Sequence, residues 1–170
     1  MSSRAGETFD AARAGAEVRE LLEADVPADG PASADGDPVT GEWTVTTGPG
    51  FRIVPLWEGE GLTGVYGNEW TDAADTATGY LEALGKTLET GWGPYRKITI
   101  DGALIRWQMD QPVDPLFDAL FSVDLYGDLH VWQPRPDRWV AATVGHSDGD
   151  APLVLAALVT DRPIPEPEGP

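Results

Sequence analysis

The segments of this sequence that alternate apolar and polar residues, as β-strands do, follow one another in adjacent pairs. Residues 42–47 and 51–57 are separated by Gly48-Pro49-Gly50, and residues 128–133 and 138–145 are separated by the turn-forming segment PRPD. Strands joined by such short connections pair antiparallel, whereas parallel strands need a long crossover. We therefore expect an α+β fold with a mainly antiparallel sheet of roughly five to seven strands, and not a doubly wound parallel sheet.

A further hairpin is predicted over Arg96–Gln108, RKITIDGALIRWQ. The dipeptide Asp101-Gly102 is typical of a two-residue type I′ turn. The resulting register places Ile98 opposite Ile105 and Arg96 opposite Trp107, which makes one face of the hairpin mostly apolar.

Helical spacing of apolar residues predicts one long helix over residues 71–90, with Thr71 as its N-cap and Gly91 at its left-handed C-terminal position. Residues 114–121 predict a short helix, because Asp114 is a good N-cap and a proline follows it. Residues 8–24 show only a partial apolar stripe, so we expect a loosely attached N-terminal helix. The apolar run PLVLAALV, residues 152–159, fits either a buried strand or a helix.

Composition divides the chain into three parts. Residues 1–41 combine the N-terminal helix with a segment, residues 25–41, that is dense in Pro, Gly, Ala and Asp and is expected to be a flexible acidic linker. Residues 42–161 are expected to form a single α+β domain. Residues 162–170 are rich in proline and are expected to be an extended tail.

The chain is strongly acidic, with a formal net charge of −18 over 170 residues. Residues 42–161 alone hold 18 acidic and 7 basic side chains, a net charge of −11. Like charge opposes approach to a phosphate backbone or an anionic membrane, so direct binding to nucleic acid or membrane is not expected. A basic protein is the electrostatically natural partner, and a homo-oligomer is compatible with the sequence.

Several classes of site are excluded or unsupported by the residue types present. The chain has no Cys, which excludes disulfides, thiolate zinc sites and cysteine nucleophiles. No Gly-rich phosphate loop occurs, and we expect no cofactor. The N-terminal residues lack an apolar signal region, and the longest apolar run is far shorter than the roughly 20 residues of a membrane span. We expect a soluble, cytoplasmic protein.

The segment Gly145-His146-Ser147-Asp148-Gly149 matches the G-x-S-x-G pattern. It resembles the nucleophile elbow of α/β-hydrolases, which implies Ser147 as a nucleophile and, as the alternative function, a serine hydrolase or esterase-like enzyme using Ser147 and His146. In that family the acid and then the histidine follow the serine, whereas both His of this chain, His130 and His146, precede Ser147. We therefore predict a polar turn and no catalytic residues.

A metal site is a weaker alternative for the same segment. His146, Asp148 and Asp150 lie close together in sequence and could hold a hard cation. A calcium loop starting at Asp148 needs a glutamate at its twelfth position, which is occupied by Val159. We predict no metal site.

The seven Trp are the remaining candidates for a binding surface. Trp70 and Trp92 flank the long predicted helix in polar, Gly-containing segments, and Trp132 lies in a predicted strand close to PRPD. Tryptophan is enriched at interface hot spots, so these three are the predicted binding residues.

Charge and tryptophan content together predict a small acidic, non-enzymatic binding module that docks a protein partner. In bacteria, domains of this size and charge suit immunity proteins, adaptors and secretion chaperones. Electrostatic steering by a net charge of −11 would accelerate association with a basic partner and would weaken in salt.

Overall fold

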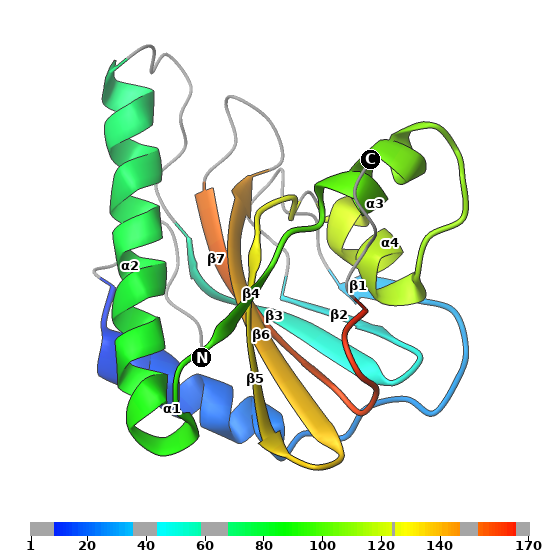
Figure 1. Cartoon of the computed structure of the whole chain (residues 1–170), viewed down its shortest axis with the longest axis horizontal. Coiled ribbons are helices and arrows are strands. Elements are labelled where there is room, and N and C mark those ends of the chain that lie inside the picture. The colour runs from blue at the N-terminus through cyan, green and yellow to red at the C-terminus, as the bar shows by residue number, and fades with distance from the viewer. Residues whose placement is uncertain (1–8, 36–43, 59–67, 124, 147–152, 166–170) are drawn as a thin grey trace.

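The computed structural model describes residues 9–35, 44–58, 68–123, 125–146 and 153–165. Within these ranges the chain forms a seven-stranded antiparallel sheet in the order β1-β2-β3-β7-β6-β5-β4 (Figure 1). The strands are β1 (Ser33–Asp35), β2 (Val45–Gly48), β3 (Phe51–Glu58), β4 (Arg96–Ile98), β5 (Leu129–Arg135), β6 (Arg138–His146) and β7 (Leu153–Thr160). The predicted α+β class with a mainly antiparallel sheet is confirmed.

The apolar run that fitted either a strand or a helix is strand β7, at the centre of the sheet. It pairs with β3 on one side and with β6 on the other, and all of its described side chains are buried. A strand covered on both faces carries no polar alternation, so its sequence pattern resembles that of a buried helix.

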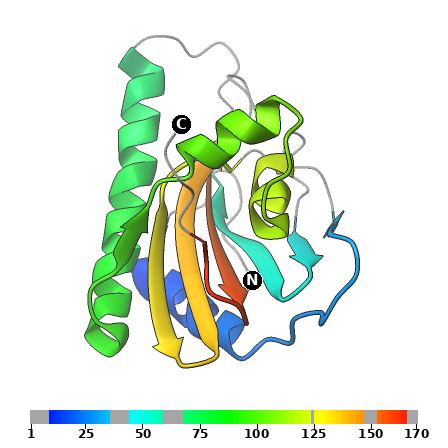
Figure 2. The same cartoon turned by 45° about the vertical axis from the view of Figure 1, so that its right-hand side comes forward.

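Helices cover both faces of the sheet (Figures 1 and 2). On one face, α1 (Ala11–Leu22) and α2 (Asn68–Trp92) form an apolar cluster with residues of β3, β5, β6 and β7. On the other face, α3 (Asp101–Gln108) and α4 (Pro115–Ser122) form a second cluster with the side chains that point the opposite way from the same strands. The sheet therefore separates two cores.

The N-terminal helix is packed, so the expectation of loose attachment is wrong. Asp10 caps α1 by accepting hydrogen bonds from the backbone N–H groups of its first turn. Val18 is fully buried in the same cluster as Leu84 and Leu88 of α2. After the helix, Arg138 Nη1 donates to the carbonyl oxygen of Ala24 at 3.1 Å. The apolar stripe of α1 is narrow in the sequence because small residues form part of its close contact with α2.

Part of the segment expected to be a linker is also tied to the sheet. Strand β1 pairs with β2, with Ala34 opposite Thr46. The backbone N–H of Gly50 donates to the carbonyl oxygen of Pro27, and Arg162 Nη2 donates to that of Ala28 at 2.9 Å. Residues 36–43 lie outside the described part of the chain.

The predicted hairpin over Arg96–Gln108 is wrong in its second half. Only Arg96–Ile98 forms a strand, β4, which pairs with β5. Asp101 lies in the first turn of α3, where its carboxylate complements the positive end of the helix. Ile100, Ala103 and Trp107 follow the three- and four-residue spacing of a helix, and all three pack on the α3–α4 side of the sheet. Packing of this stripe overrides the local turn preference of Asp101-Gly102.

The observed ends of α2 and α4 can be compared with the predicted helix ends. Helix α2 begins at Asn68, so Thr71 lies inside it and is not its N-cap. Gly91 is also helical, and Gly93, with φ of 78°, is the left-handed residue that follows the helix. Helix α4 confirms the predicted short helix, because Asp114 accepts a hydrogen bond from the backbone N–H of Leu116 at 2.9 Å.

Within the described residues, none of the helices combines the length and the apolar character needed to cross a membrane.

Candidate functional site

The residues of the G-x-S-x-G segment fall largely outside the described ranges, which include neither Ser147 nor Asp148 and Asp150. His146 ends β6, where its backbone pairs with Leu153, and its side chain is not described. The next described element is strand β7, whereas a nucleophile elbow leads from a strand into a helix. The described residues also contain no group of three His, Asp or Glu side chains that could hold a metal ion. The absence of a catalytic or metal role for this segment stays a prediction.

The three predicted binding tryptophans do not form one surface. Trp70 lies in the first turn of α2, and its side chain is not among those that the structure describes. Trp92 ends the same helix, roughly 33 Å away at the helical rise of 1.5 Å per residue. Trp132 is 2% exposed, so it belongs to the core. Its indole packs edge-on against Trp92 and donates from Nε1 to the carbonyl oxygen of Gly93 at 3.1 Å.

Trp92 and Trp132 do line a shallow hollow of about 370 Å³ at the edge of β5. Three of its seven lining residues are tryptophans, and one, Arg96, is a cation. The N–H of Trp132 is satisfied inside the protein, so this indole offers a ligand no hydrogen bond.

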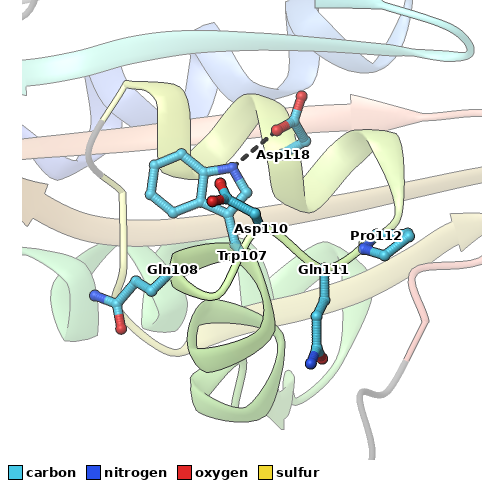
Figure 3. Close-up of a pocket in the computed structure, with 6 residues that line it drawn as sticks. All are labelled: Trp107, Gln108, Asp110, Gln111, Pro112 and Asp118. Carbon is cyan, nitrogen blue, oxygen red and sulfur yellow. Dashed lines mark hydrogen bonds between the residues drawn. The ribbon is translucent and has the colours of Figure 1, made fainter.

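A larger hollow, of about 530 Å³, lies on the other side of the sheet, at the connection between the end of α3 and the start of α4 (Figure 3). It is lined by Trp107, Gln108, Asp110, Gln111, Pro112 and Asp118. In Figure 3 the carboxylate of Asp110 points toward the side on which Trp107 and Asp118 lie, while Gln108 and Gln111 extend away from the indole. The hollow therefore joins an aromatic wall to two carboxylates.

The chain forms this hollow by reversing sharply after α3. Asp110 adopts a left-handed backbone conformation with φ of 57°, which aspartate tolerates better than most residues. The backbone N–H of Gln111 donates to the carbonyl oxygen of Arg106 at 2.9 Å, which closes the end of the helix. The turn thereby brings residues 107–112 next to the first turns of α4.

The orientation of the indole at this hollow is fixed from two sides. Trp107 Nε1 donates to Asp118 Oδ1 at 2.9 Å. The ring also packs against Phe121 of α4, with 5.5 Å between ring centroids. The hydrogen bond occupies one oxygen of the Asp118 carboxylate and leaves the other available to a ligand.

The segment that leads into the hollow also exposes two large apolar side chains. Ile105 is 41% exposed and Met109 is 63% exposed, and both belong to α3 or its C-cap. The described part of the chain has one more exposed large hydrophobic side chain, Tyr95, which stacks on His130. We call Ile105, Trp107, Met109, Asp110 and Asp118 the α3–α4 face.

The charge on this face is strongly unbalanced. Residues 101–122 contain four Asp, one Arg and no Lys or Glu. Among the ion pairs between described residues, none involves Asp110 or Asp118. The two carboxylates therefore remain available to a cation from outside.

His130 is a second unusual polar group, on the same side of β5 as Trp132. It is 8% exposed, and its Nδ1 has no hydrogen-bond partner within the described chain. The ring of Tyr95 stacks on it with 3.9 Å between centroids. Burial lowers the pKa of His130 below its ordinary value of 6.5, and the charge of Lys97 lowers it further, against smaller opposing effects of Asp128 and Glu82.

The chain shows no significant match to any protein-family model, to any curated protein or to any solved structure.

The sequence alone does not reveal the α3–α4 face, because the turn dipeptide Asp101-Gly102 predicts a strand where α3 lies. In the predicted hairpin Trp107 faced Arg96 and belonged to the sheet. The signal that could have found the site is the helical spacing of Ile100, Ala103 and Trp107, followed by an aspartate at the point where the chain reverses.

Proposed function

We propose that this protein is a small acidic, non-enzymatic binding module that docks a basic protein partner through the α3–α4 face. The observation that supports it is that one short segment, α3 with its C-cap, exposes the apolar side chains of Ile105 and Met109 and ends at a hollow whose two carboxylates form no ion pair with any described residue. An apolar patch with charged groups at its rim is the usual arrangement of a protein interface.

The two components of this face have different roles in binding. Burial of the side chains of Ile105 and Met109 would supply affinity, because apolar area leaves water. The carboxylates of Asp110 and Asp118, together with the net charge of −18, would accelerate encounter with a basic surface. A partner without an apolar surface would therefore bind with lower affinity, and a partner without basic residues would associate more slowly.

The specific roles open to such a module include immunity protein, adaptor and secretion chaperone. All three use a preformed face to hold a protein, and none requires a catalytic group. The fixed indole of Trp107 provides a rigid element of this kind, since both its ring and its N–H are held by α4.

Site-specific photocrosslinking in source cells tests this function. A benzophenone amino acid placed at Met109 should capture one or a few basic proteins. The matched control places it at Thr78, an exposed residue of α2 on the opposite layer, and should capture none of them. In lysate, the adducts should decrease when salt rises from about 50 mM to about 300 mM, because screening shortens the range of the attraction.

Equal adducts from positions 109 and 78, or captured proteins that are acidic, would contradict the proposal. The Ile105→Ser variant provides a second control, because it removes apolar area and leaves the charge unchanged. It should reduce the adducts formed from position 109 without unfolding the protein, since Ile105 is exposed.

A further inference from the structure

The hollow between α3 and α4 carries a more specific chemical signature than the face around it. One of its walls is the indole of Trp107, whose electron-rich surface attracts cations. The carboxylates of Asp110 and Asp118 lie at the same hollow. A ligand that suits all three groups is cationic, flat and rich in N–H donors.

We propose that this hollow receives an arginine side chain of the docked partner, an inference that rests on the proposed function. The guanidinium would lie against the indole of Trp107 and donate to the second oxygen of Asp118 and to Asp110. Gln108 and Gln111 also line the hollow but extend away from the indole, so the two carboxylates are the acceptors of this subsite.

Three features favour arginine over lysine. A guanidinium is planar, so it stacks on an indole and donates to carboxylates at the same time, whereas an ammonium group acts as a point charge. A guanidinium is also more weakly hydrated, which lowers the cost of moving it out of water and against the indole. The carboxylate of Asp118 is already oriented by the Trp107 N–H, at 2.9 Å, and this favours a donor with fixed geometry.

A metal ion is a poorer occupant of this hollow. The two aspartates do not belong to any group of three ligands among the described residues, and Asp118 shares one oxygen with an indole N–H. The aromatic wall also offers no ligand to a hard cation such as Ca²⁺ or Mg²⁺.

The test is a titration of the full-length protein with short peptides, followed through the Trp107 indole N–H in nitrogen–proton correlation spectra. Trp107→Phe assigns this signal, because the signal disappears in that variant. Acetylated and amidated Gly-Arg-Gly should shift it saturably. The matching Gly-Lys-Gly peptide should bind about three- to fivefold more weakly, as expected for loss of stacking and of the planar hydrogen bonds.

A peptide with citrulline in place of arginine supplies the control for charge, because its side chain has nearly the same shape and is neutral. It should give no saturable shift. Equal binding of the arginine and lysine peptides, or a saturable shift with the citrulline peptide, would overturn the assignment.

Variants of the protein locate the binding site. Asp110→Asn and Asp118→Asn should each weaken the arginine peptide about two- to fivefold, the range of an exposed charged pair. Asp75→Asn removes the same unit of charge from the exposed surface of α2 and should leave the affinity unchanged. Asp110 is exposed and makes no ion pair among the described residues, so its substitution does not threaten the fold. A loss of affinity in Asp75→Asn as large as that in Asp110→Asn would show a diffuse charge effect and would refute the site.

Failure of this inference and failure of the proposed function give different results. Crosslinks from position 109 without a preference for arginine would leave the docking face in place and remove the arginine subsite. Arginine-selective binding without any crosslinked protein would keep the subsite chemistry, and would refute the statement that the arginine comes from a docked protein.

Discussion

The two helical layers of this protein are both acidic, but they differ in what accompanies the charge. Residues 68–92, which form α2, contain five acidic side chains and one lysine, and residues 101–122 contain four Asp and one Arg. None of the described side chains of α2 is an exposed large hydrophobic group, whereas the α3 segment exposes Ile105 and Met109 and ends at a hollow. Acidity alone is therefore compatible with a solvated surface, and its combination with exposed apolar area is what supports the proposed docking face.

The tryptophans of the two layers show the same contrast. The N–H of Trp132 is bound to a backbone carbonyl, and its ring is buried among other aromatic rings. The N–H of Trp107 is bound to a carboxylate, and its ring borders open space. The first arrangement stabilises the fold, and the second orients a carboxylate at the edge of the hollow, where we propose that it meets a ligand.

We expect the largest difference in stability between the two layers when these two tryptophans are replaced by alanine. Trp132→Ala should lower the free energy of unfolding by about 3–5 kcal/mol, the usual cost of removing a buried aromatic side chain. Trp107→Ala should cost about 1–2 kcal/mol, because its ring is only partly buried and its hydrogen bond lies at the surface. Urea denaturation followed by circular dichroism measures both values, and equal losses would contradict the distinction between the layers.

A smaller effect tests how firmly the N-terminal helix belongs to the α2 layer. Val18→Ala removes two methyl groups from a fully buried position between α1 and α2. We expect a loss of about 1–2 kcal/mol, the transfer energy of the lost groups. The exposed position Arg13 of α1 provides the control, and Arg13→Ala should change stability by at most about 0.5 kcal/mol. A helix that is only loosely attached would make the two variants equivalent.

The pH dependence of stability tests the buried histidine of the α2 layer. Because the pKa of His130 is lowered in the folded state, the unfolded chain binds a proton more readily below pH 6.5. The contribution of His130 is therefore fully present above 6.5, and the free energy of unfolding falls as the pH falls toward the folded pKa.

His130→Gln should flatten this dependence between roughly pH 7.5 and 5.5, whatever its effect on stability at neutral pH. The other titrating groups, His146 included, are present in both proteins, so they cancel when the two curves are subtracted. Urea midpoints measured at a series of pH values supply the curves. An unchanged slope would show that His130 titrates alike in the folded and unfolded states.

The sequence predicted those elements whose signals are local. Asp114-Pro115 specified the start of α4 because a cap and a first-turn proline act within a few residues. The antiparallel sheet followed from short connections between adjacent strands. For residues 153–160, the local pattern was ambiguous, because burial of both faces of β7 depends on two helical layers that are distant in sequence.

The candidate site was not predicted, because two local signals of the same segment compete, a helical spacing and a turn dipeptide, and distant contacts decide between them. The turn preference of Asp101-Gly102 was correctly recognised, but the burial of Ile100 and Ala103 in the second core outweighed it. The partial burial of Trp107 and the full burial of Trp132 likewise depend on distant contacts, since their hydrogen-bond partners, Asp118 and Gly93, are 11 and 39 residues away. Composition predicts an acidic binding surface, and the proposed place of that surface depends on the packing of α3 on α4.

The smallest expected change in stability belongs to Met109→Ala, and this small change is what makes the variant informative. Met109 is 63% exposed, so its truncation should alter the free energy of unfolding by at most about 0.5 kcal/mol. Loss of the same side chain from the core of an interface would cost about 1–2 kcal/mol of binding free energy. The dissociation constant for the partner would therefore rise roughly 5- to 30-fold. Binding of the crosslinked partner by calorimetry, compared with Thr78→Ala on α2, measures the difference. If both variants bind the partner as the wild type does, the exposed apolar side chains of α3 are surface residues without a docking role, and the two layers differ only in shape.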